Sequence, residues 1–218
     1  MKILTCSAHL QHLEGILRKS LPIALPVFGA VLNINRGNPG QFEVLVDKWP
    51  EFGAVLARPS GEVASGDMEH CRRRGDTAPW HHCSWICGSL GTLGVLGLDL
   101  GMMGAGLGYW AHWKQGFGPA PGVRVGSLSP SHVDLLNETW PYGGNARSRR
   151  FLAEILGRFP QVCLQDGSGQ PLAWVLTDHF GTGTHSYTLP EHRRHGHMQV
   201  ALTVAAQRAH ARGFPTFG

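Results

Sequence analysis

The chain has 218 residues, of which 42% are hydrophobic and 16% are charged, and its formal net charge is +4. This length fits one large domain or two small ones, and the hydrophobic share excludes a chain too polar to form a packed core. A mildly basic charge suits a small polyanionic ligand as well as nucleic acid, so charge alone identifies no partner.

The cysteines and the N-terminus indicate the compartment. The 5 cysteines are an odd number, and the N-terminus lacks the apolar run and small-residue cleavage site of a secretory signal. We therefore expect reduced thiols inside the cell.

The first of three unlike parts, residues 1–66, reads as an α+β segment. Leucine and isoleucine recur at helical spacing, which predicts a helix over residues 7–19. Three apolar runs rich in β-branched residues predict strands of a small antiparallel sheet, the first two joined by a turn of glycine, asparagine and proline. The predicted strands are Val27–Ile34, Phe42–Val46 and Ala54–Ala57, and the turn is Asn35–Gly40.

The middle part, residues 67–126, is rich in glycine and offers no strand or helix with a packing face, so we expect an irregular or disordered segment. The run Ile86–Trp110 is long enough to span a bilayer, but its glycines and Asp99 argue against a membrane span.

Histidine, cysteine and arginine clusters invite two further interpretations. A zinc site would use thiolate and imidazole donors from residues 70–87, but their spacing matches no common zinc pattern, and we expect no metal site. Nucleic-acid binding would use the arginines, but there is no aromatic ladder beside them, so we expect solvated surface charge. The donors are His70, Cys71, His81, His82, Cys83 and Cys87, and the arginines are Arg72–Arg74, Arg147, Arg149 and Arg150.

The last part, residues 127–218, carries clear local signals. Ser129 precedes Pro130 at a predicted helix start, and Asn145 caps a second predicted helix with an apolar face. A glycine-rich turn then joins two strands of a hairpin, a third strand follows, and a final helix ends in basic residues and glycine. The hairpin strands are Gln161–Gln165 and Pro171–Thr177, the third strand is about residues 184–189, and the last helix is about residues 198–212.

The connection between the third strand and the last helix predicts an anion site. Unpaired backbone N–H groups at a helix start attract negative charge, and a glycine lets the backbone approach a phosphate closely. Arg193 and Arg194 add charge-assisted donors just before Gly196.

These residues also carry a resemblance. The pattern Arg193-x-x-Gly196-x-Met198 resembles the acyl-CoA signature of the GNAT acetyltransferase superfamily, and four longer strings resemble the glycine N-acyltransferase family. The resemblance covers residues 1–70 and 125–218. The strings are Val27–Pro39, Val44–Phe52, Tyr187–Arg194 and Arg212–Pro215.

The resemblance implies an α+β, GNAT-like acyltransferase fold and transfer of an acyl group from acyl-CoA to the amino group of glycine or another small amino acid. Acyl-CoA would be a cosubstrate, with no permanently bound cofactor, and the protein a mitochondrial or else cytoplasmic monomer. Thr188 and Leu189 would contact pantetheine. The pyrophosphate would be held by Arg193, Arg194, Gly196, His197 and Met198.

Two departures from the family qualify this reading. Where the glycine-specific enzymes carry a glutamate base, this chain has Thr182, and His179 and His185 are the nearest titrating groups, with His185 a weak candidate. Residues 127–218 also end before the family's fifth strand and later elements, so we expect a partial acyl-CoA-binding domain. The alternatives are an inactive, truncated member that binds CoA weakly or not at all, and a metal- or membrane-associated protein acting through residues 70–110.

Overall fold

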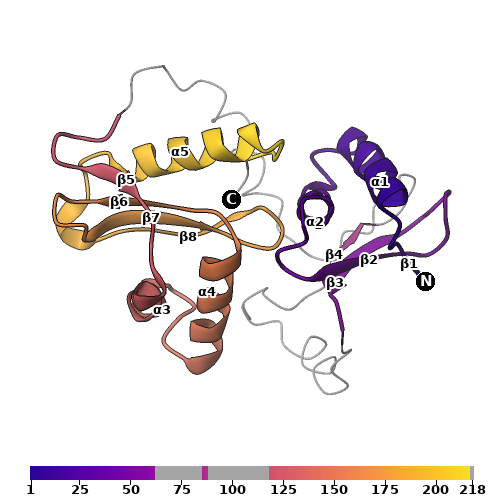
Figure 1. Cartoon of the computed structure of the whole chain (residues 1–218), viewed down its shortest axis with the longest axis horizontal. Helices are drawn as coiled ribbons and strands as arrows, with labels where there is room; N and C mark the ends of the chain where they lie inside the picture. The colour runs from indigo at the N-terminus through magenta and orange to yellow at the C-terminus, as the bar shows by residue number, and fades with distance from the viewer. Residues whose placement is uncertain (62–84, 88–117, 217–218) are drawn as a thin grey trace. The chain divides into compact units, whose positions relative to one another are not determined.

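The computed structural model describes residues 1–61, 85–87 and 118–216 (Figure 1). The chain divides into two compact units, Met1–Gly97 and Leu98–Gly218. Each unit joins helices to an antiparallel four-stranded sheet, as the expected α+β class requires.

The first unit places two helices against its sheet, whose strand order is β1-β2-β3-β4. Helix α1 packs on α2, and α2 packs on the strands (Figure 1). The predicted helix and the predicted strand at Phe42–Val46 are confirmed. The elements are β1 Lys2–Ile3, α1 Ser7–Lys19, α2 Leu25–Asn35, β2 Phe42–Val46, β3 Val55–Pro59 and β4 Trp85–Cys87.

The predicted strand at Val27–Ile34 is wrong, because these residues lie inside helix α2. The run is apolar on every side, so its periodicity cannot separate a buried strand from a buried helix. Every residue of α2 from Val27 to Asn33 is buried, and Pro26 occupies the first turn, where its missing N–H removes no helical bond.

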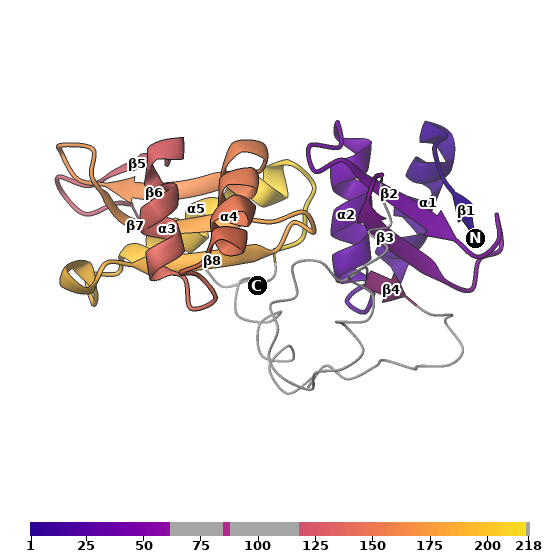
Figure 2. The ribbon, with the colours of Figure 1, turned by 90° about the horizontal axis from the view of Figure 1, so that it is seen from below.

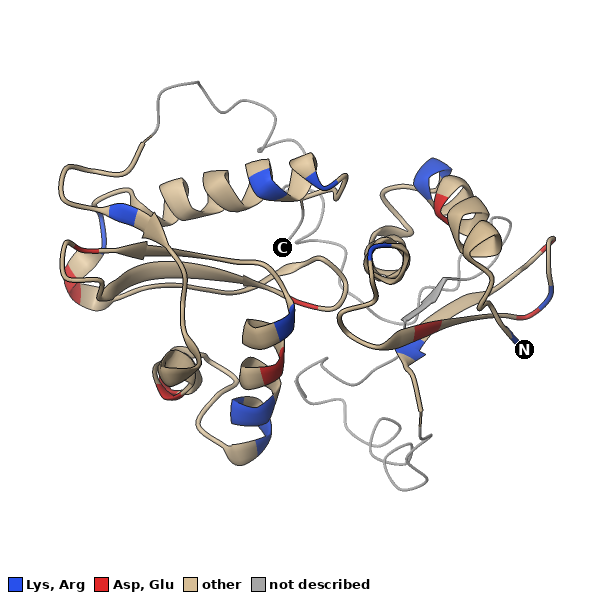
Figure 3. Cartoon of the chain, in the orientation of Figure 1, with Lys and Arg blue, Asp and Glu red and all other residues tan. Residues whose placement is uncertain are grey.

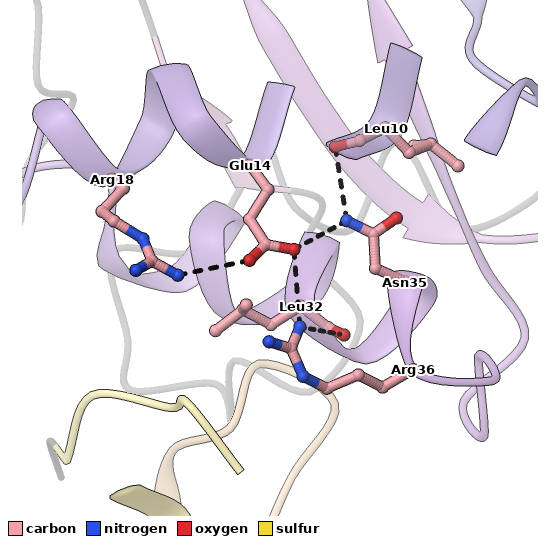
Figure 4. Close-up of polar contacts among 6 residues, drawn as sticks. All are labelled: Leu10, Glu14, Arg18, Leu32, Asn35 and Arg36. Carbon is pink, nitrogen blue, oxygen red and sulfur yellow. Dashed lines mark hydrogen bonds and ion pairs between the residues drawn. The ribbon is translucent and has the colours of Figure 1, made fainter. Parts of the chain in front are cut away.

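A polar cluster centred on Glu14 fastens α1 to α2 (Figure 4). The Oε2 atom of Glu14 accepts from Asn35 Nδ2 at 2.8 Å and from Arg36 Nη1 at 3.4 Å, and Oε1 accepts from Arg18 Nη2 at 3.3 Å. Asn35 also donates to the carbonyl of Leu10 at 3.3 Å. The side chain of Asn35, the last residue of α2, thus satisfies two polar groups of α1.

The second unit is an antiparallel meander, β5-β6-β7-β8, with helices on both faces. In Figure 2, α3 and α4 lie in front of the sheet and α5 behind it. The order predicted from the sequence is confirmed. The elements are β5 Arg124–Gly126, a 3-10 turn Pro130–His132, α3 Val133–Thr139, α4 Ala146–Arg158, β6 Gln161–Gln165, β7 Pro171–Thr177, β8 Gly183–Thr188, a 3-10 turn Pro190–His192 and α5 His197–Ala211.

Alternation along the central strands builds two separate cores. Trp174 and Leu176 of β7 face α3 and α4, whereas Ala173 and Val175 face α5. Cys163 of β6 is fully buried on the first face, and burial raises the pKa of its thiol to about 12, so it is a core residue rather than a nucleophile.

Helix caps follow the predictions. Asn145 Oδ1 accepts from the backbone N–H groups of Arg147 and Ser148, at 3.0 and 2.9 Å. The basic residues of α4, blue in Figure 3, are exposed, and Arg149 pairs with Asp134 at 2.6 Å between Nε and Oδ1. This agrees with the expected solvated charge.

The expectation that residues 67–126 contain no strand is wrong at two places. Strand β4, Trp85–Cys87, pairs with β3, and strand β5, Arg124–Gly126, pairs with β6. Each is only three residues long and lies at the edge of its sheet, where pairing with an existing strand, not local propensity, determines the conformation.

Candidate active site

Strand β8 is the edge of its sheet within the described residues. Its pairing with β7 shifts between the pairs Val175–Ser186 and Thr177–Gly183, so β8 carries one extra residue there. This bulge, at Thr184–His185, interrupts the ladder in the middle of the strand. Bulges of this kind are common beside active sites, where they redirect a strand and leave backbone groups unpaired.

The loop after β8 has a backbone suited to an anion. Arg194 and Gly196 both adopt left-handed conformations, with φ of 67° and 77°. Gly196 is the N-cap of α5, and within the described part of the chain no side chain caps this helix. The first backbone N–H groups of a 15-residue helix therefore point to the loop without a capping partner, which is the geometry of a phosphate site.

Arg193 folds back onto the end of β8. Its Nε donates to the carbonyl of Thr188 at 3.2 Å, its Nη2 donates to the hydroxyl of Tyr187 at 3.2 Å, and its guanidinium carbon lies 5.4 Å from the centre of the Tyr187 ring. These contacts hold the guanidinium between strand and loop. Arg194, by contrast, is exposed on the loop itself.

The two residues expected at the pantetheine arm are Thr188, the last residue of β8, and Leu189, which follows it. Leu189 packs beside the core under α3 and α4, and its N–H donates to the carbonyl of Leu172 at 3.0 Å. The hydroxyl of Thr188 is buried and has no hydrogen-bond partner in the described structure. A buried hydroxyl without a partner is costly, so this atom is suited to a ligand group.

Three histidine rings surround the helix start. The His197 ring centroid lies 6.3 Å from that of His192 and 5.8 Å from that of His195. Burial lowers the pKa of His197, and the neighbouring His195 and His192 lower it further. An anion bound beside the His197 ring would favour its protonated form and so oppose this lowering of the pKa.

The two histidines considered as bases face other elements. His185 is 2% exposed, its Nε2 donates to the carbonyl of Leu136 at 2.9 Å, and burial lowers its pKa to about 4. His179 Nε2 donates to Glu154 Oε1 at 3.3 Å, and its ring packs on Phe159. The lowered pKa of His185 does not suit a base at neutral pH. The Nε2 atom of His179 is engaged by Glu154.

Sequence reasoning missed Asp178, in the turn between β7 and β8. Its Oδ1 accepts from the N–H groups of Phe180 and Thr182, at 2.9 and 3.0 Å. Burial nevertheless raises the pKa of this carboxyl to about 6, against the effect of those bonds. The sequence signals a turn at Asp178, but no local pattern reveals that the carboxyl is desolvated.

Two further expectations concern a metal site and a membrane span. The proposed zinc donors and most of Ile86–Trp110 lie outside the described residues. In the part that is described, no three His, Cys, Asp or Glu side chains gather where they could hold a metal ion. None of the described helices is both long and apolar enough to cross a membrane.

Comparison with known proteins identifies the family. Residues 1–74 and 110–160 match the model of the aralkyl acyl-CoA:amino acid N-acyltransferase family. The mouse glycine N-acyltransferase-like protein Keg1 is 31% identical over 100% of this chain and 88% of its own length. Bovine glycine N-acyltransferase is 30% identical, over 100% and 88%, and bovine glycine N-phenylacetyltransferase is 29% identical, over 95% and 85%.

One solved structure shares the fold. An X-ray structure of a Drosophila protein superposes with a TM-score of 0.60 at 11% identity, covering 97% of this chain and 85% of that one. At this identity the likeness concerns the fold alone. The family model and the two relatives of 30% identity or more show that the chain belongs to the aralkyl acyl-CoA:amino acid N-acyltransferase family.

Proposed function

We propose that this chain transfers an acyl group from an acyl-CoA thioester to the amino group of glycine or another small amino acid. The observation that carries the proposal is the uncapped start of α5, reached through a loop with two left-handed residues and two arginines. Membership of an acyl-CoA:amino acid N-acyltransferase family supplies the reaction class.

The pyrophosphate of CoA would bind at this loop. The N–H groups of His197 and Met198 would donate to its oxygens, and Gly196 leaves open space, since a Cβ added there meets no atom within 4 Å. Arg193 and Arg194 would supply charge-assisted bonds. Arg193 is the better organised of the two, because Thr188 and Tyr187 already fix its guanidinium.

The pantetheine arm would lie along the outer edge of β8. An edge strand offers a row of backbone N–H and C=O groups, and an amide-containing arm can pair with them as another strand would. Thr188 and Leu189 would contact the arm where it leaves the loop. The buried Thr188 hydroxyl, which has no partner within the described residues, is suited to one of its amides.

The chemistry requires no covalent intermediate on the protein. The amine nitrogen attacks the thioester carbon, the C–S bond breaks, and CoA leaves as the thiol once a proton is returned. The protein's task is to hold the two reactants together and to remove a proton from the acceptor ammonium.

A thiol-release assay tests the proposal. Purified protein is mixed with benzoyl-CoA or phenylacetyl-CoA, with and without glycine, and free CoA thiol is followed by colour reaction. We expect release that depends on glycine and that falls about tenfold or more in R193A, since a charge-assisted contact contributes roughly 1.5–3 kcal/mol. Y187F is the matched control, because it keeps the arginine and removes only one of its tethers.

Absence of glycine-dependent release at millimolar substrate contradicts the proposal. If CoA still shifts the thermal unfolding midpoint in that case, the chain is a CoA-binding member of the family without transferase activity, the alternative stated above. We further propose a mitochondrial, monomeric protein, as expected from the family resemblance. Import of a fluorescent fusion and sedimentation of the pure protein test these two points.

A further inference from the structure

We propose that Asp178 is the general base of this acyl transfer, and that its carboxylate receives the proton lost by the acceptor ammonium. The inference rests on the proposed function, since it assigns a residue to the reaction proposed there. Its support comes from the position of Asp178 in the fold and from a second aspartate in the same sheet.

The reaction needs a base because amino groups with pKa values near 8 or above are mostly protonated at neutral pH. An N–H bond of the ammonium breaks, its proton passes to an oxygen of Asp178, and the freed electron pair of nitrogen forms the new bond to the thioester carbon. The C–S bond then breaks. The nitrogen gives up its second proton, which the departing CoA sulfur takes up, and Asp178 releases the first proton to water, so that its carboxylate is restored.

A second aspartate of the same sheet, Asp166 in the turn between β6 and β7, can be compared with Asp178. Asp166 Oδ1 accepts from the N–H groups two and four residues ahead, Ser168 at 2.8 Å and Gln170 at 2.9 Å. Asp178 Oδ1 accepts at the same offsets, from Phe180 at 2.9 Å and Thr182 at 3.0 Å.

The backbone bonds of the two turns match as well. The N–H of Asp166 donates to Gln170 at 3.0 Å, and that of Asp178 donates to Thr182 at 3.1 Å. In each turn the carbonyl of the aspartate accepts at 3.1 Å from the glycine three residues ahead, which has a positive φ. The two aspartates therefore make the same set of hydrogen bonds within their turns.

The two carboxyls nevertheless behave in opposite ways. Asp166 and Asp178 are both partly exposed as whole residues. Hydrogen bonds, first of all from the Ser168 side chain, lower the pKa of Asp166, as expected for a carboxylate that accepts such bonds. Burial outweighs the same kind of bonds at Asp178 and raises its pKa to about 6. An asparagine could accept both turn bonds without the cost of desolvating a charge, so the turn alone does not account for a carboxyl at this position.

Packing around the turn explains the desolvation. Phe214, in the segment after α5, lies against Gly181, where an added Cβ would come within 2.8 Å of the ring. On the other side His179 packs on Phe159 of α4. Asp178 as a whole residue keeps partial exposure.

The place of Asp178 along β8 suits the reaction. The strand runs from Gly183, next to this turn, to Thr188, next to the phosphate loop, a rise of about 17 Å at about 3.3 Å per residue. A CoA whose pyrophosphate lies at α5 and whose arm follows the strand brings its thioester toward the Gly183 end. The bulge at Thr184–His185 lies between the two.

The other titratable groups near the turn do not determine the pKa of Asp178. His179 is engaged by Glu154 of α4, His185 is in the core, and the guanidinium of Arg212 lies over Phe214 at 5.1 Å from the ring centre. The causes of the raised Asp178 pKa are burial, opposed by hydrogen bonds from the turn, with no charged side chain among them.

The test is D178N, with D166N as its matched control. Asparagine keeps the two turn bonds, so D178N should unfold cooperatively and bind CoA with wild-type affinity. We expect its kcat for glycine acylation to fall about 100- to 1,000-fold, within the range that a general base contributes. D166N should retain wild-type kcat. The wild-type rate should decline below about pH 6, and the pH profile of D178N should lack this acidic decline.

A further readout separates a base from a structural residue. The free amine fraction grows about tenfold for each pH unit below the amine pKa. The deficit of D178N should therefore shrink as pH rises toward 9. A D178N enzyme with wild-type kcat and an unchanged acidic limb overturns the assignment of Asp178 while leaving the proposed function intact. A wild-type protein with no glycine-dependent CoA release overturns both.

Discussion

The ring of Phe214 lies directly against the backbone of Gly181, so that a Cβ added to this glycine would come within 2.8 Å of Phe214 Cδ1. Gly181 also has a φ of 73°, which side chains disfavour. This contact ties the segment after α5 to the turn that contains Asp178.

We expect G181A to destabilise the protein by more than the ~1 kcal/mol that a left-handed conformation alone costs. Gly144 is the matched control, since it has a φ of 80° and nothing within 4 Å of an added Cβ. The free energy of unfolding in urea measures both variants. In an F214A background the G181A penalty should shrink to that of G144A, and an unchanged penalty would mean that Phe214 does not press on this turn.

The two turn aspartates should change stability in opposite directions when replaced by asparagine. Asp178 has a folded pKa of about 6, above the value of about 3.9 in an unfolded chain, so the unfolded state ionises first and stability falls as pH rises between these values. D178N should therefore raise the unfolding midpoint at pH 7, by the equivalent of ~1 kcal/mol after allowance for partial exposure.

Asp166 has a lowered pKa, so its ionised form stabilises the folded state above the unfolded pKa, and D166N should lower the midpoint at pH 7. Calorimetry at pH 7 and at pH 3.5 checks both variants. The difference between D178N and wild type should vanish at pH 3.5, and shifts of the same sign for both variants at pH 7 would contradict the account.

His185 should make the protein sensitive to acid. Its folded pKa of about 4 lies below the unfolded value of about 6.5, so the unfolded state takes up a proton first and stability falls as pH drops through this window. The full difference corresponds to about 3 kcal/mol. Denaturant unfolding between pH 7.5 and 4 should show this loss in the wild type and a smaller one in H185L. Equal slopes in both proteins would exclude His185 as the source.

CoA binding should take up protons. The pKa of His197 is lowered in the free protein by burial and by His195 and His192, and a bound pyrophosphate favours the protonated ring. Affinity should therefore increase as pH falls from 8 to 6. Calorimetric titrations in two buffers of different ionisation enthalpy measure the uptake directly, and H197Q should reduce it. Net proton release on binding would contradict this arrangement of the loop.

The sequence predicts most of the second unit because its signals are local. Asn145 at a helix start, the turn at Asp166, and the glycine and arginines before α5 each determine structure within a few residues. Patterns of this kind determine the local structure whichever elements pack around them. The loop before α5, the hairpin and the final helix were all predictable for this reason.

The remaining features depend on contacts between distant residues. Val27–Ile34 is apolar on all sides and becomes helical because α1 and the sheet enclose it. Strands β4 and β5 exist through pairing with β3 and β6. Asp178 and Asp166 look alike in the sequence, and only the packing of Phe214 and of α4 distinguishes them. The base is accordingly the part of the site that sequence reasoning missed.

The most direct measurement is product formation from isotope-labelled glycine, followed by mass spectrometry, in the wild type, R193A and D178N. The account predicts labelled N-acylglycine in stoichiometric step with CoA from the wild type, less product from R193A through weaker acyl-CoA binding, and a low kcat at unchanged CoA affinity in D178N. No labelled product from the wild type at saturating acyl-CoA would contradict the central claim that this chain is an acyl-CoA:amino acid N-acyltransferase.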